Sequence, residues 1–109
     1  MNGAAWENYL IGDEPCTCLR INQCLSNSTS VSLLWQKLPD VGRTLGFEGS
    51  NRIVSTVLLG IKSHSGYLED ILKTWRQATT NNATLGNLVT VLRNHHLNEC
   101  AEALINEFR

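Results

Sequence analysis

The spacing of the apolar residues restricts the fold of this chain more than any other feature of its sequence. Toward the C-terminus they recur every three or four positions, as Leu97, Cys100, Ala101, Leu104, Ile105 and Phe108. That spacing puts all of them on one side of an α-helix. The preceding segment repeats it with Leu85, Leu88, Val89 and Leu92. The two segments predict a helical hairpin that turns at residues 94–96, with Thr84 as the cap of its first helix.

Two further helices are predicted upstream of this hairpin. The apolar residues of segment 67–75 share one helical face, and the polar residues 63–66 precede it. In segment 53–61 the helical pattern is carried by Ile53, Val54, Val57, Leu58 and Ile61. Their offsets of 0, 1, 4, 5 and 8 favour a helix, although the β-branched side chains also suit a strand. Ser50 is the expected cap of this segment, and Gly60 predicts an early end to it.

The first half of the chain predicts two shorter helices. Pro39 suits the first position of a helix, and Gly46 suits the position just after the end of one, so a helix is expected over residues 39–45. Because proline breaks a helix when it lies in the interior, residues 31–38 are expected to form a separate turn. A weaker apolar spacing predicts another helix over residues 18–25.

The whole pattern predicts an all-α domain. No segment alternates apolar and polar residues as a half-buried strand does, and no Asn-Gly or Asp-Gly hairpin turn occurs. We therefore expect a bundle of six short antiparallel helices around one core, for which 109 residues suffice. Residues 15–109 are assigned to this domain and residues 1–14 to an N-terminal tail, whose Trp6, Tyr9, Leu10 and Ile11 can pack onto it.

The charge balance argues against several classes of function. Nine Lys and Arg residues against ten Asp and Glu residues give a net charge of −1, whereas nucleic-acid binding requires a basic surface. Apolar runs such as Val57 to Leu59 are far too short to cross a bilayer. The first nine residues have no basic cluster before an apolar stretch, so they do not resemble a secretory signal. We expect a cytoplasmic protein with reduced thiols and no insertion into a membrane.

The cysteines and histidines leave two minor alternatives open. Cys16, Cys18 and Cys24 could bind zinc with a histidine, but zinc sites normally space two cysteines by two or more residues, and here one residue separates the first pair. His96 and Cys100 are four positions apart and could form a nucleophile pair, but Cys100 belongs to the apolar face of its helix. We expect neither a metal ion nor catalysis.

Four stretches of the chain resemble signatures of the death-domain family. Residues 41–46 (Val-Gly-Arg-Thr-Leu-Gly) resemble the second-helix pattern of the family, Leu-Ala-Arg-x-Leu-Gly. Residues 72–77 resemble the end of its fourth helix, which closes on Leu-x-x-Trp-Arg, residues 83–93 its fifth helix and residues 100–104 its last. Order and spacing agree throughout. One departure is Leu38, because the family usually has a tryptophan just before its second helix.

The resemblance implies a domain without a catalytic centre or cofactor that binds another death-domain protein. Relatives of this kind are receptors and adaptors of apoptotic and Toll-type innate immune signalling, and some form higher-order oligomers. Complementary charges orient such contacts, so charged residues outside the apolar faces are the candidate binding residues. They are Asp40, Arg43, Glu48, Arg52, Asp70, Lys73 and Arg76. The alternative interpretation is a helix-turn-helix domain that binds nucleic acid, which the net charge disfavours.

Overall fold

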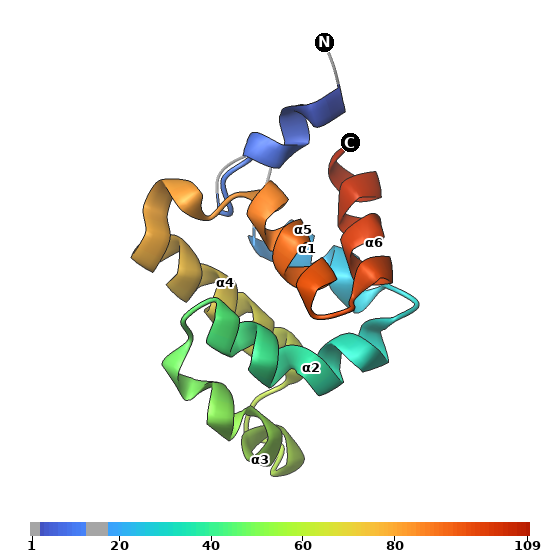
Figure 1. Cartoon of the computed structure of the whole chain (residues 1–109). Coiled ribbons are helices and arrows are strands. Elements are labelled where there is room, and N and C mark those ends of the chain that lie inside the picture. Colours follow the sequence, from blue (N-terminus) through green and yellow to red (C-terminus); the bar gives the residue numbers. More distant parts are fainter. Residues whose placement is uncertain (1–2, 13–17) are drawn as a thin grey trace.

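A computed structural model describes residues 3–12 and 18–109, and the regular structure in them is helical apart from one isolated β-bridge. The α-helices are α1 (Cys18–Ser26), α2 (Val31–Thr44), α3 (Ile53–Leu58), α4 (His64–Thr79), α5 (Leu85–Asn94) and α6 (Asn98–Phe108). Short 3-10 helices are η1 (Gly3–Asn8), η2 (Glu48–Arg52) and η3 (Thr80–Asn82). The predicted all-α fold with six helices is confirmed (Figure 1).

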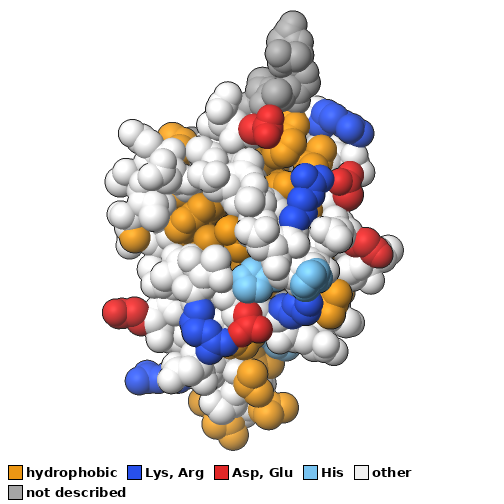
Figure 2. Space-filling model, viewed as in Figure 1, with side chains coloured by type: hydrophobic (Ala, Val, Ile, Leu, Met, Phe, Trp, Pro, Cys, Tyr) orange, Lys and Arg blue, Asp and Glu red, His pale blue; other side chains and the backbone are white. Residues whose placement is uncertain are grey.

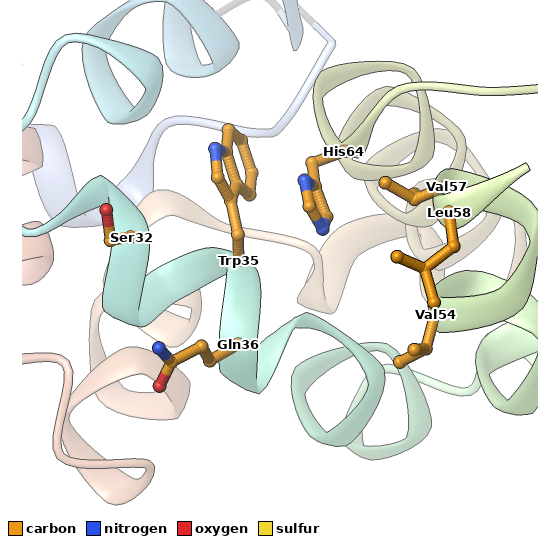
Figure 3. Close-up of a pocket in the computed structure, with 7 residues that line it drawn as sticks. All are labelled: Ser32, Trp35, Gln36, Val54, Val57, Leu58 and His64. Carbon is orange, nitrogen blue, oxygen red and sulfur yellow. The ribbon is translucent and has the colours of Figure 1, made fainter. Parts of the chain in front are cut away.

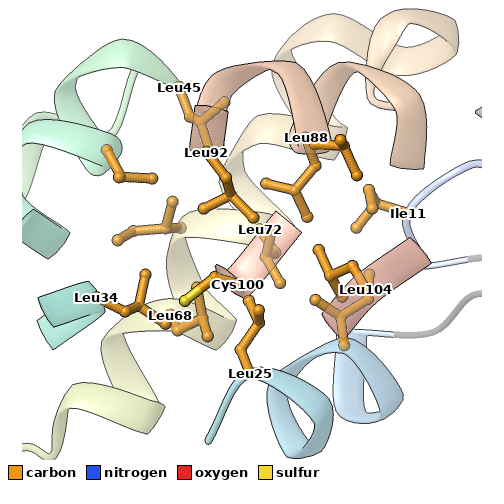
Figure 4. Close-up of a cluster of buried hydrophobic side chains, with 14 of the residues drawn as sticks. Ile11, Leu25, Leu34, Leu45, Leu68, Leu72, Leu88, Leu92, Cys100 and Leu104 are labelled. Carbon is orange, nitrogen blue, oxygen red and sulfur yellow. The ribbon is translucent and has the colours of Figure 1, made fainter. Parts of the chain in front are cut away.

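The hairpin of α5 and α6 forms one wall of the core, as the apolar spacing predicts. Leu88, Leu92, Cys100 and Leu104 are each at most 1 % exposed, and they meet the buried side chains of α1, α2 and α4 (Figure 4). The Thr84 side chain accepts a hydrogen bond from the Asn87 N–H at 3.2 Å, so the predicted cap of α5 is present. Helix caps and a continuous apolar face together fix this element.

Helix α4 crosses the bundle and also follows its sequence signals. The Ser63 side chain caps it by accepting a hydrogen bond from the Gly66 N–H at 3.0 Å. Its apolar face, which includes Leu68, Leu72 and Trp75, is buried. The indole of Trp75 therefore contributes to the core, as expected for a large apolar ring on that face.

Helix α2 differs from the prediction because Pro39 does not break it. The helix runs without interruption from Val31 to Thr44, with Pro39 inside it. Leu34 and Leu38 are fully buried and Val41 is 1 % exposed, so the helix packs on the core on both sides of the proline. Burying each of these side chains contributes about 1.5–3 kcal/mol, which together exceeds the cost of about 3 kcal/mol for an interior proline.

Helix α3 is shorter than predicted and begins differently. Ser50 is not its cap, because this residue is buried in η2 and its hydroxyl donates a hydrogen bond to the Phe47 carbonyl at 2.8 Å. The helix ends at Leu58, and Gly60 takes a φ of 73°, which turns the chain away. The predicted early end is thus confirmed. Of its apolar residues, Ile53 is buried at 1 % exposure, whereas most of the others face outward.

The segment before α1 packs onto the bundle. Ile11 is fully buried, its N–H donates to the Ala83 carbonyl at 2.8 Å, and the Leu85 N–H donates to the Tyr9 carbonyl at 2.8 Å. Gly86 permits this approach, since a β-carbon there would lie 2.9 Å from the Glu7 carbonyl oxygen. The segment therefore covers the start of α5, and the domain boundary at residue 15 stays a prediction.

None of the helices described for residues 3–12 and 18–109 combines the length and the apolar character that a bilayer crossing needs.

Candidate interaction surfaces

The charged residues predicted on α2 and η2 lie at one end of the molecule, where these two elements pack together. Asp40 and Arg43 form an ion pair one turn apart on α2, and both side chains are more than half exposed. Glu48 and Arg52 lie at the two ends of η2 and are exposed. No ion pair joins either of them to another described residue, so their charges are available to a partner.

The charged residues predicted on α4 follow one another at intervals of three residues, and each contacts a different partner. Asp70 pairs with Lys62, which precedes α4 and also lies over the ring of Tyr67 at 5.0 Å from its centroid. Lys73 pairs with Glu69 at 3.1 Å.

Lys73 lies near α1, and Arg76 lies near the C-terminal end of α4. Burial raises the pKa of the Cys18 thiol on α1, and the nearby Lys73 ammonium partly offsets that rise, so Lys73 lies on the side of α4 that faces α1. Arg76 donates to the Thr80 carbonyl at 2.6 Å, at the end of the helix. The predicted binding residues thus lie along α4 and on the α2–η2 end. The ion pairs that Asp40, Asp70 and Lys73 form are exposed and contribute little to stability.

An apolar surface at the tip of α3 is a second candidate interaction site, which was not among the charged residues predicted from the sequence. Val54, Leu58, Leu59 and Ile61, here called the α3 ridge, are 58, 81, 75 and 73 % exposed. Figure 2 shows hydrophobic side chains gathered at this end of the molecule. A signal for the ridge exists in the sequence: segment 53–61 has six apolar residues, which is more than one face of a two-turn helix can bury.

A groove lies beside the ridge, between α2 and α3. Its volume is about 480 Å³, and Figure 3 shows the residues that line it: Ser32, Trp35, Gln36, Val54, Val57, Leu58 and His64. The rings of Trp35 and His64 stack with their centroids 5.2 Å apart and their planes 6° apart. Burial lowers the pKa of the His64 imidazole, so this ring is neutral near pH 7.

The cysteines of the described residues are structural thiols. Burial raises the pKa of Cys100, which lies 3.8 Å from the Ser28 hydroxyl and donates to the Ser30 carbonyl at 3.9 Å. A protonated, buried thiol is a poor nucleophile, so the geometry gives no support to a pair with His96. Among residues 3–12 and 18–109, no three His, Cys, Asp or Glu side chains converge as metal ligands. Cys16, part of the zinc hypothesis, lies outside the described residues.

Comparison with known proteins agrees with this architecture. The family model described as "Death domain" matches residues 20–108, which is most of the chain and includes all six α-helices except the first two residues of α1. Neither the curated proteins nor the solved structures include one that matches the chain. The domains of this family are modules for homotypic protein–protein interaction. With a match of this extent and six helices around one core, the chain belongs to the death-domain family.

Proposed function

We propose that this chain recruits another death-domain protein into a cytoplasmic signalling complex of apoptosis or innate immunity, as adaptors and receptors of this family do. The observation that carries the proposal is the family match over residues 20–108. Nothing in the proposed role needs catalysis or a cofactor.

The α2–η2 end is the surface that we assign to this partner. Among the described residues, no ion pair involves Glu48 or Arg52, so neither needs to give one up there in order to bind a partner. Asp40 and Arg43 lie on the helix against which η2 packs, and their exposed pair is weak enough to be exchanged for contacts across an interface. Two acidic and two basic side chains on one end give a mixed pattern that fixes the orientation of a partner better than it raises affinity.

Charge reversal tests this assignment. We expect Arg52→Glu to weaken binding to a death-domain partner at least tenfold, because the new carboxylate faces the acidic groups that Arg52 attracts. Arg43→Glu has a similar effect, since it also places a second carboxylate beside Asp40. Arg76→Glu has a smaller one, because Arg76 already donates to the Thr80 carbonyl. Isothermal titration calorimetry against the death domains that bind the wild-type chain measures each loss.

Arg93→Glu is the matched control for these reversals. It changes the charge by the same amount on α5, where Arg93 pairs with Glu102 of α6 and with no residue of α2 or η2. Circular dichroism must show that every variant keeps its helices. If Arg43→Glu, Arg52→Glu and Arg76→Glu all bind as the wild type does, the surface is wrongly assigned. If no death domain binds the wild-type chain, the recruitment proposal itself is wrong.

The helix-turn-helix alternative is not favoured. With a net charge of −1 the chain has no basic excess to neutralise phosphates. We expect no shift of a DNA or RNA duplex in a gel at low salt, the condition that most favours such binding.

A further inference from the structure

We propose that the α3 ridge and the groove beside it form a two-fold symmetric contact between two copies of this chain. This inference goes beyond the recruitment of a death-domain partner, since it concerns a different surface and a different occupant.

The α3 ridge exposes apolar side chains to water, which is unfavourable for a monomer. Leu58, Leu59 and Ile61 each keep more than 70 % of their surface in contact with solvent. They are adjacent in the chain apart from Gly60, whose φ of 73° holds Ile61 outside the bundle. Contiguous patches of this kind mark interaction sites, because leaving them in water costs about 25 cal/mol for each Å².

The groove gives the ridge a complementary receptor on the same molecule. Leu58 belongs to both features: it lines the groove, and its side chain is 81 % exposed. The floor beside it is formed by the half-buried Trp35 and Val57 (Figure 3). A projection that lies next to a matching hollow is what an isologous contact requires, because a two-fold axis between them inserts Leu58 of each copy into the groove of the other.

The lack of charge on the ridge and in the groove favours a second copy of the chain over a partner that binds through complementary charges. Residues 53–61 contain no Lys, Arg, Asp or Glu, and the groove is lined by uncharged side chains apart from His64. A partner recognised by its charge gains nothing here, whereas two uncharged surfaces meet without leaving a charge buried and unpaired. The net charge of −1 also leaves little repulsion between copies.

The area that the proposed dimer buries indicates how stable the dimer is. Two ridges and grooves facing each other bury on the order of 1,000 Å², the lower limit for a specific interface. We therefore expect a reversible dimer with a Kd on the order of 10–100 µM, which forms when the chain is concentrated in an assembly.

Sedimentation velocity over micromolar to near-millimolar concentrations tests the contact. The wild-type mass should rise with concentration toward twice 12.1 kDa and stop there. Leu58→Asp should weaken the dimer more than tenfold, because each copy would place a carboxylate in an apolar groove. Gln36→Glu, an isosteric change of an exposed groove residue, should weaken it severalfold without touching the core.

Leu19→Asp is the matched control. Leu19 is 64 % exposed on α1, which packs against α4 and α6, so this variant should dimerise as the wild type does. Arg43→Glu, seven residues along α2 from Gln36 of the groove, should also dimerise normally, which separates this contact from the partner surface. A wild-type chain that stays monomeric throughout, a mass that grows past the dimer, or equal effects of Leu19→Asp and Leu58→Asp would each overturn the proposal. The proposal would also be overturned if the wild-type chain is monomeric and Leu58→Asp no longer binds a death-domain partner.

Discussion

The rings of Trp35 and His64 stack and thereby join α2 to the first residue of α4. Because His64 also lines the groove, its protonation links the groove to the stability of the fold. Burial lowers the pKa of the His64 imidazole, so the folded state binds its proton less readily than the unfolded state does. The free energy of unfolding that depends on this group is therefore fully present above the unfolded pKa of about 6.5. It is lost as the pH falls through the lower pKa of the folded state.

We expect acidification from about pH 7.5 to about pH 5.5 to lower the Tm of the wild type more than that of His64→Phe. The phenyl ring keeps the stack on Trp35 but cannot accept a proton. Since His64 is only partly buried, the difference should stay below the about 1.4 kcal/mol that one pKa unit represents. Thermal unfolding followed by circular dichroism measures it. Equal losses of Tm in the two proteins would show that His64 has no such role.

Single residues also show where inference from the sequence stops. The apolar spacing correctly places Leu88, Leu104 and Trp75 in the core. It does not reveal which charges pair, because the Lys62–Asp70 contact joins the loop after α3 to α4 across eight positions and depends on the tertiary fold. The candidate binding residues could be named by their polarity, but the partners of their charges could not.

At the scale of elements, local signals predict a helix well when caps and apolar faces agree. Thr84 caps α5 as expected and Ser63 caps α4, and both helices have one continuous buried face. Around Pro39 the local signal and the packing disagree, and the packing of α2 on the core decides the outcome. In α3 the many apolar residues predict a buried helix, yet the segment is too short to bury them, so its outer face became visible only in the structure.

The N-terminal segment gives the sharpest test at this scale. If it belongs to the folded unit, Ile11→Ala should lower the free energy of unfolding by about 2–4 kcal/mol, because it leaves a cavity where a fully buried side chain lies. Leu10→Ala, at the neighbouring half-buried position, should cost less. Urea denaturation of the full chain measures both. A cost near zero for Ile11→Ala would support a tail that ends at residue 14.

At the scale of the whole molecule, two neighbouring surfaces have different chemical characters. The α2–η2 end carries Glu48 and Arg52 without intramolecular ion pairs to described residues, and we assign it to a death-domain partner. The α3 ridge is uncharged, and we assign it to a second copy of the chain. Since the two surfaces differ in chemistry, a variant of one should leave the other intact, and a chain could bind its partner and its copy at once.

Both assignments depend on the central claim that the chain acts by binding other death domains through its surface. Multi-angle light scattering of the chain, alone and mixed with a panel of death domains, tests that claim most directly. We predict a stoichiometric complex with at least one member of the panel and none with an unrelated helical protein of similar size. A chain whose mass stays the same with every death domain, at concentrations where weak complexes form, would contradict it.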